Sequence, residues 1–313
     1  MERINLRGQP IDLDITLNCG QAFRWRKRED GVWCGVVRDR LIELTTADGG
    51  LLWRTYPAGG LDLVTDYFRL NENVNAIYAY LADRDRRLAE LTHRFHGLRL
   101  LRQDPTETLL SFICSAATSI PRIMAAIEGL AETYGDLVCE KESLCYYAFP
   151  KVERLAGLDS LTSELRQALG FRRDNLRIAA RQIADRGEGW LISLRKAGYP
   201  EAKAALLGIR GVGRKIADCT CLFSLDKDDA VPVDTHVRQV AHRYFLPDLN
   251  SGSVTDAVYN KVAQAFVERF GQYAGWAQEF LFYEDLLRTR ALGRGAAYTT
   301  NSGRPTWPRR SPI

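Results

Sequence analysis

The chain has 313 residues, of which 46% are hydrophobic and 26% are charged, as in a folded globular protein rather than a disordered or fibrous one. Its length suggests about two domains and is sufficient to bury a core without disulfides or metal. No apolar run approaches the roughly 18 residues of a membrane-spanning helix, and the charged N-terminus is unlike a secretory signal. We therefore expect an intracellular protein with no membrane partner.

The positive charge is concentrated at the C-terminus. The whole chain carries 43 Lys and Arg against 39 Asp and Glu, a net charge of +4. Four arginines and no acid lie in residues 291–313, so the remainder is formally neutral: Arg294, Arg304, Arg309 and Arg310. Any attraction to nucleic acid must then come from a local patch, backbone amides or helix N-termini. The tail lacks apolar periodicity, and we expect it to be disordered.

The seven cysteines favour reduced thiols over a metal or cluster site. They include no Cys-x-x-Cys pair, and none follows Cys221. An odd number spread along an intracellular chain is typical of core or site residues. Structural zinc and iron–sulfur clusters need grouped ligands, so we expect neither.

Residues 1–100 are predicted to form an antiparallel β domain with helices. Short strand-like runs occur at 22–25, 31–37, 41–45 and 51–56. Turn signals at 29–31 (Glu-Asp-Gly) and 48–50 (Asp-Gly-Gly) separate some of them, as in hairpins. Apolar residues at helical spacing then predict one helix over 74–91.

Residues 101–290 are predicted to be mainly α-helical, which makes the fold class α+β. The first helix has a strong start signal, with Asp104 as N-cap, Pro105 at the first helical position and Glu107 two residues later. Periodicity and cap signals predict further helices at 122–131, 162–169, 174–184, 201–207, 234–244 and 254–270.

The segment 206–222, LLGIRGVGRKIADCTCL, is typical of two helices joined by a glycine-rich turn. Such a turn, followed by a helix N-terminus, can direct backbone N–H groups at a phosphate. A helical hairpin with a glycine cap and no ligand is the alternative.

Lys215 lies in the first turn of the second of these helices, beside Arg214. The positive end of the helix dipole and the neighbouring cation both disfavour an ammonium, so we expect a lowered pKa. A neutral amine can act as a nucleophile and form a Schiff base. Cys219, four residues later, is on the same helix face. The alternative is an ordinary surface lysine.

The segment 231–236, VPVDTH, places Asp234 where a helix N-cap belongs, because Pro232 favours extended backbone before it. An ionised carboxylate there could stabilise the oxocarbenium-like state through which a glycosidic bond breaks. A lysine nucleophile with a fixed carboxylate suits cleavage of an N-glycosidic bond. Asp234 could equally serve only as a cap.

The hairpin and the aspartate segment together resemble the helix–hairpin–helix DNA glycosylase superfamily. Four further blocks resemble its 8-oxoguanine DNA glycosylase family: CGQAFRW (19–25), LLRQDPTETLLSFICS (100–115), ALGFRRDN (168–175) and YAGWAQEFLF (273–282). The resemblance implies a helix–hairpin–helix glycosylase domain at 101–290, and a monomer that requires no cofactor. It also implies excision of 8-oxoguanine from duplex DNA by base flipping, with lyase activity, in a bacterial cytoplasm or a nucleus.

By this resemblance, Lys215 attacks C1′ of the damaged nucleotide and Asp234 stabilises the charge that develops on the sugar. The Gly20 carbonyl corresponds to the acceptor of the N7–H that distinguishes 8-oxoguanine from guanine. The remaining base contacts are an amide at the Watson–Crick edge and two side chains that sandwich the base, which correspond to Gln278, Cys219 and Phe282.

The resemblance also assigns residues to the DNA around the lesion. Phosphate contacts fall on Gly211, Val212, Gly213 and His236. Backbone carbonyls that could hold a structural cation are those of Leu207, Ile209 and Val212. The arginines that read the orphaned cytosine are Arg122 and Arg172, and the wedge between the strands is Phe171.

One departure from the family concerns the base opposite the lesion. Ala117 stands where an asparagine usually fills the space left by the flipped base. We therefore expect excision to depend less sharply on cytosine opposite the lesion. The alternatives are a helix–hairpin–helix glycosylase for another damaged base and a non-catalytic DNA-binding module.

Overall fold

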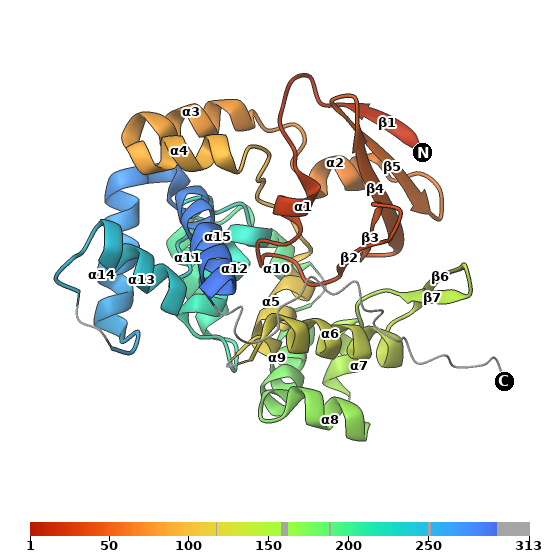
Figure 1. Ribbon diagram of the computed structural model, residues 1–313. Coiled ribbons are helices and arrows are strands. Elements are labelled where there is room, and N and C mark those ends of the chain that lie inside the picture. Colours follow the sequence, from red (N-terminus) through yellow and green to blue (C-terminus); the bar gives the residue numbers. More distant parts are fainter. Residues whose placement is uncertain (117, 158–161, 188, 250–251, 293–313) are drawn as a thin grey trace.

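The computed structural model describes residues 1–292 except 117, 158–161, 188 and 250–251. Five antiparallel strands form a sheet near the N-terminus, in the spatial order β1-β5-β4-β3-β2 (Figure 1). Their bounds are β1 Glu2–Asn5, β2 Trp25–Lys27, β3 Trp33–Val37, β4 Arg40–Ala47 and β5 Gly50–Tyr56. The predicted antiparallel sheet is confirmed.

The strand predicted at 22–25 is mostly wrong, since only Trp25 belongs to β2. The preceding residues turn toward the helical region instead: Phe23 packs edge-on against Phe112 at 5.3 Å, and Arg24 donates to the Tyr147 carbonyl. Strand β1 was not predicted, because its sequence, ERIN, has no run of apolar residues.

Four helices accompany the sheet: α1 Leu13–Thr16, α2 Leu61–Tyr67, α3 Val74–Arg84 and α4 Arg86–Arg94. The single helix predicted at 74–91 is therefore wrong. Asp85 has extended backbone (φ −152°, ψ 122°), and its side chain caps α4 by accepting from the Arg87 and Leu88 amides. Both helices face one core, so the apolar spacing continues across the break.

Each helix predicted in the second region is present, with ends within three residues of the prediction. Its helices are α5 Pro105–Cys114, α6 Ile120–Tyr134, α7 Val152–Ala156, α8 Ser163–Leu169, α9 Arg172–Arg186, α10 Trp190–Ser193, α11 Tyr199–Leu207, α12 Arg214–Ser224, α13 Thr235–Tyr244, α14 Asp256–Phe270 and α15 Ala274–Leu292, with a 3₁₀ turn, η1 Gly271–Tyr273. The α+β fold class is confirmed.

A hairpin of β6 Leu137–Lys141 and β7 Leu144–Tyr147 was not predicted. Its turn residues, Glu142 and Ser143, have positive φ without the usual Asn-Gly signal. The hairpin is anchored to the sheet because Lys141 pairs with Glu43, a buried residue of β4.

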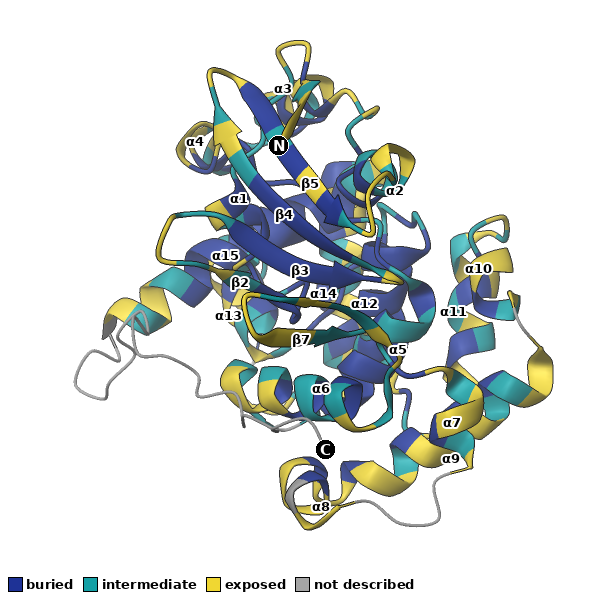
Figure 2. Cartoon of the chain, turned by 90° about the vertical axis from the view of Figure 1, so that its right-hand side faces the viewer, coloured by how far each residue is buried: buried dark blue, intermediate teal, exposed yellow. Residues whose placement is uncertain are grey.

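The main core joins α3 and α4 to the helices that follow residue 100. Tyr78 of α3 contacts Phe280 of α15 edge-on at 5.3 Å, and Phe95 contacts Tyr283 at 5.0 Å. A second core lies between the sheet and α1 and α2. Figure 2 shows buried residues along β3, β4 and β5 and many exposed ones on α8 and α9. The division at residues 100 and 290 stays a prediction about folding units.

The predicted basic tail, 291–313, lies almost entirely outside the described residues. Among the described helices, none combines the length and the apolar character that a membrane span requires.

Candidate active site

A cavity of about 30 Å³ lies where α5, α12 and α15 meet the N-terminal segment that precedes β2. Six residues singled out from the sequence line it: Gly20, Lys215, Cys219, Asp234, Gln278 and Phe282. They come from four separate parts of the chain. The fold thus brings together the residues to which the resemblance assigns the reaction and the recognition of the base, while their roles stay predictions.

Helix α12 presents Lys215 and Cys219 to the cavity. The helix begins after Gly213, which provides no side-chain cap, and Ile216 to Ser224 are all buried. Its orientation is fixed by buried Asp218, which accepts from Lys203 at 2.8 Å and from Tyr199 at 2.7 Å on α11. Loss of these hydrogen bonds is therefore expected to misplace Lys215, although none of them involves Lys215 itself.

The expectation that Lys215 has a lowered pKa is wrong for the free protein. Burial by itself lowers the pKa of the Lys215 ammonium, whereas Cys219, Asp234 and Glu279 outweigh burial, and the net pKa is raised. Arg214 does not contribute the expected repulsion, because its guanidinium points to α14, where it donates to the Asn260 side chain at 2.6 Å. Lys215 must therefore lose a proton before it can act as a nucleophile.

Asp234 is the N-cap of α13, as predicted. Its Oδ1 accepts from the Val237 amide at 3.0 Å, while the preceding Pro232 lines the cavity. The Tyr259 hydroxyl holds the same segment by accepting from the Val233 amide at 3.3 Å. One carboxylate oxygen is thus fixed by the helix, and the helix N-terminus favours its negative charge.

The segment that carries Gly20 is held against the helices by Gln21, which is 1% exposed. The Gln21 amide donates to the carbonyls of Thr16 at 2.9 Å and Arg99 at 2.8 Å, and its oxygen accepts from the Leu101 amide at 2.9 Å. These bonds satisfy the amide fully and fix the backbone of Gly20 beside α15.

Phe282 closes the cavity in this state. A Cβ built on Gly20 would lie 3.4 Å from the Phe282 ring, so the ring rests against the glycine backbone. The cavity volume is enough for one or two water molecules and not for a purine base. A base can enter between Cys219 and Phe282 only if the ring moves.

Glu279 lines the same cavity and was missed by the sequence analysis. It is 1% exposed, and its Oε1 has no hydrogen-bond partner. Burial raises the pKa of Glu279 to about 8, and Asp234 adds to this, while Cys19 and Lys215 act in the opposite direction. The only signal in the sequence is an acid within the apolar run WAQEFLF.

The glycine-rich turn leaves donors free at the start of α12. Gly211 has a φ of +82°, and its missing side chain matters, since a Cβ there would lie 2.7 Å from Cβ of Asn175. Gly213 is extended and Val212 is buried. This geometry suits a phosphate at the helix N-terminus. His236 lies on α13, and its Nδ1 is 2.8 Å from Asp285.

The residues assigned to the opposite base differ in accessibility. Phe171 is 66% exposed, as a wedge requires, and Arg122 is exposed at the start of α6. Arg172 is buried: its Nε donates to the Ala116 carbonyl at 2.7 Å and its Nη1 to the Leu169 carbonyl at 3.0 Å. Arg172 would have to give up these bonds to the backbone carbonyls before its guanidinium could bind a base. Ala117 lies outside the described residues.

No group of three or more His, Cys, Asp or Glu in the described part of the chain could hold a metal ion. The carbonyls named for a structural cation belong to the last residue of α11 and to the turn that follows it. Leu207 is 42% exposed, whereas Ile209 and Val212 are buried. The Ile209 carbonyl accepts from the Val212 amide at 3.1 Å and retains a second lone pair.

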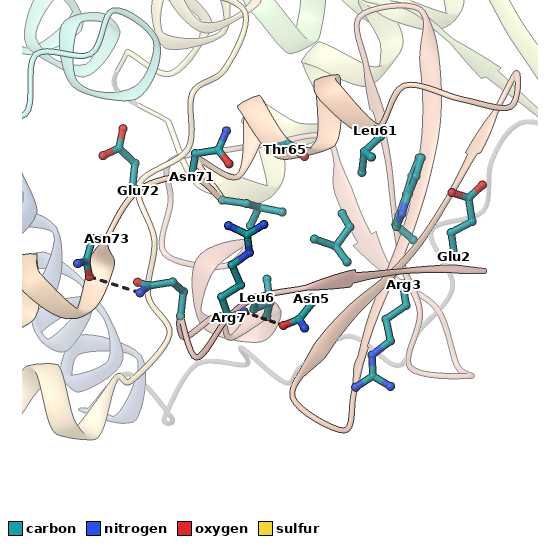
Figure 3. Close-up of a pocket in the computed structure, with 14 residues that line it drawn as sticks. Glu2, Arg3, Asn5, Leu6, Arg7, Leu61, Thr65, Asn71, Glu72 and Asn73 are labelled. Atoms are coloured by element: carbon teal, nitrogen blue, oxygen red, sulfur yellow. Dashed lines mark hydrogen bonds between the residues drawn. The ribbon is translucent and has the colours of Figure 1, made fainter.

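A larger cavity, of about 550 Å³, lies at the edge of the sheet, between β1 and α2. Figure 3 shows that Arg7, Asn71 and Glu72 are among the residues that line it. None of the residues predicted for the reaction or for DNA lines this larger cavity.

Comparisons with known proteins agree with this arrangement. Residues 3–109 match the model of the 8-oxoguanine DNA glycosylase N-terminal domain. Residues 110–255 match that of the HhH-GPD superfamily of base excision DNA repair proteins.

Individual relatives give the same result. The N-glycosylase/DNA lyase OGG1 of Arabidopsis thaliana is 33% identical over 299 residues, which cover 92% of this chain and 81% of that protein. A solved structure of MBOgg1 with a low-affinity DNA ligand has a TM-score of 0.81 at 31% identity, and covers 90% of this chain and 94% of its own. The Clostridium acetobutylicum 8-oxoguanine glycosylase/lyase, solved with DNA containing cytosine opposite 8-oxoguanine, has a TM-score of 0.79 at 30% identity, with coverages of 89% and 93%. The chain therefore belongs to the 8-oxoguanine DNA glycosylase family of the HhH-GPD superfamily.

Proposed function

We propose that this chain is a bifunctional DNA glycosylase and lyase that removes 8-oxoguanine from duplex DNA. The observation that carries the proposal is the cavity shared by an amine, Lys215, and a fixed carboxylate, Asp234, beside the residues that match the family's base contacts. Duplex DNA is the partner, and no cofactor takes part in bond cleavage.

The proposed reaction uses Lys215 as the nucleophile. The lone pair on Nζ forms a bond to C1′, and the C1′–N9 bond breaks with its electron pair moving to the base. The Asp234 carboxylate stabilises the positive charge that develops on the sugar. The C1′–O4′ bond then breaks as O4′ takes a proton from Nζ, and the lone pair freed on Nζ forms the C=N bond of a protonated Schiff base. Loss of a 2′ proton then expels the 3′ phosphate and nicks the strand.

DNA binding is assigned to the turn before α12 because the chain outside its tail is formally neutral. Amides at Gly211 and Gly213 bind a phosphate, which the Val212 amide can join only by giving up its bond to the Ile209 carbonyl. His236 binds another phosphate, oriented by Asp285. A structural cation at this turn would be held by the carbonyls of Leu207, Ile209 and Val212, which are the oxygen ligands that hard cations prefer. Such an ion would add positive charge beside the phosphate.

Recognition of the base requires the cavity to open. The flipped nucleotide displaces the Phe282 ring from Gly20 and enters between the ring and Cys219, with Gln278 at its Watson–Crick edge. The Oε1 of Gln278 has no partner in the free protein, so it is available to a base. The Gly20 carbonyl then accepts the N7–H that guanine lacks.

One nicking assay tests both the function and the opposite-base preference. We expect cleavage of duplexes that contain 8-oxoguanine and none of the matched duplex with guanine. Excision rates opposite C, A, G and T should differ less than in a strictly cytosine-dependent enzyme. Ala117 has no side-chain amide, and the Arg172 guanidinium already donates to backbone carbonyls. Binding without nicking would favour a non-catalytic DNA-binding module, and cleavage only at another lesion would favour a glycosylase for another damaged base. A steep preference for cytosine opposite the lesion would contradict the expected effect of Ala117.

Gly20→Ala is expected to reduce excision while leaving binding to undamaged duplex unchanged. The backbone at Gly20 has a φ of +96°, which is strained for alanine by about 1 kcal/mol, and the added Cβ would lie in the path of the base. Gly31→Ala is a matched control, because Gly31 has a φ of +83°, open space around it and no place in the cavity. Single-turnover excision and duplex affinity distinguish the two; equal excision by both variants would contradict a role of Gly20 in base recognition.

A further inference from the structure

The free protein holds a proton on the residue that must attack. Lys215 is half-buried, its ammonium lies 4.9 Å from the centre of the Phe112 ring, and Cys219, Asp234 and Glu279 raise its pKa. The cavity measures about 30 Å³, and a flipped base that fills it would exclude solvent from Lys215. The reaction therefore needs a proton acceptor inside the cavity.

Two carboxyl groups line the cavity, those of Asp234 and Glu279. The Oδ1 of Asp234 already accepts from the Val237 amide at the N-terminus of α13, where the helix dipole favours a negative charge. Glu279 has the opposite properties. It is 1% exposed, its Oε1 has no partner, and no helix N-terminus favours its charged form.

We propose that Glu279 accepts the proton that Lys215 must lose, through its unpaired oxygen, and returns this proton to the departing base. This inference rests on the proposed function. The transfer converts an ammonium and a carboxylate into a neutral amine and a neutral acid, which a dry site favours over two charges.

The steps balance without another reactant. A proton moves from Nζ of Lys215 to Oε1 of Glu279, which frees the lone pair on Nζ. This lone pair forms the bond to C1′ while the C1′–N9 bond breaks, and its electrons leave with the base. The base anion takes the proton from Glu279, and the carboxylate is restored for the next step.

The groups that face Glu279 determine its titration. They are Cys19 on the N-terminal segment, Lys215 and Cys219 on α12, and Asp234 at the start of α13. Both thiols have pKa values raised by burial, that of Cys219 to about 12, so both are neutral at neutral pH. With a pKa of about 8, Glu279 changes its charge between pH 7 and pH 9.

Single-turnover excision measured against pH tests the proposal. In the wild type, the rate should rise about tenfold between pH 7 and pH 9 as Glu279 becomes a carboxylate, and then reach a plateau. In Glu279→Gln, we expect a rate about 10²-fold lower at pH 8, with no plateau in this range, and unchanged affinity for the lesion. A plateau caused by the DNA would persist in the variant.

Glu284→Gln is the matched control. Glu284 is a nearly buried acid on the same helix, but it pairs with Arg87 and does not line the cavity. We expect this variant to keep the wild-type plateau and pH profile. A Glu279→Gln enzyme with the wild-type rate and pH profile would overturn the proposal. A wild-type excision rate that does not rise between pH 7 and pH 9 would also overturn it, and this measurement needs no variant.

Two further measurements separate this proposal from a structural role and from the proposed function. A buried acid with a raised pKa lowers the stability of the fold as pH rises from the pKa of the unfolded chain toward 8. The melting temperature of Glu279→Gln minus that of wild type should therefore be larger at pH 8.5 than at pH 5. The reverse order would contradict a buried, titrating carboxyl. Glu279→Gln should still form an adduct with lesion-containing DNA that borohydride traps, but more slowly than wild type. Complete loss of this adduct would show that Glu279 is needed for more than proton transfer and would overturn its assignment as the proton acceptor.

Discussion

Lys215→Gln is expected to abolish the covalent complex that borohydride traps between the protein and lesion-containing DNA. Excision should fall by several orders of magnitude, the scale on which loss of an enzymatic nucleophile acts. Glutamine fits the site without leaving a buried charge, and the contact with Phe112 is the only aromatic one that the lysine makes among the described residues. The fold and the affinity for the lesion should therefore persist.

Lys261→Gln on the exposed side of α14 controls for the loss of a positive charge. We expect this variant to trap as efficiently as wild type. Gel mobility of the reduced complex and the melting temperature of each protein are the measurements. Normal trapping by Lys215→Gln would assign the nucleophile to another amine.

Asp234→Asn is expected to slow excision by about 10²–10³-fold while lesion binding stays largely intact. The reason lies in the cap: asparagine also accepts from the N-terminal amides of a helix, so the bond to the Val237 amide survives and only the charge is removed. The transition state then loses the carboxylate that stabilises its positive charge. A normal excision rate would reduce Asp234 to a structural cap.

The matched control is Asp104→Asn. Asp104 caps α5 in the same manner, by accepting from the Thr106 and Glu107 amides, and it does not line the cavity. If both variants slow excision equally, the effect comes from helix capping and not from the charge. Excision rates on one duplex, with lesion affinity measured separately, decide between these readings.

The parts of the site that the sequence predicted depend on local signals. The glycine turn, the helix start after Gly213 and the cap at Asp234 are each determined within a few residues, and the structure has all three. The same holds for most helices of the second region. Their positions follow from caps and apolar spacing, which any chain shows before it folds.

The features that the sequence did not reveal depend on tertiary contacts. The break at Asp85 and the hairpin of β6 and β7 have weak local signals. The raised pKa of Lys215 arises from Cys219 on the same helix together with Asp234 and Glu279 from other parts of the chain, and the burial of Glu279 follows from the packing of α15. Arg172 was predicted to read a base, but in the free protein it binds backbone carbonyls.

Peptide mapping of the borohydride-reduced complex tests the central claim most directly. After digestion of the protein and the DNA, we expect the sugar remnant on the peptide that contains Lys215, as a mass increase at that side chain. A remnant on the N-terminal amine or on another lysine would contradict the assignment of the nucleophile and, with it, the proposed reaction.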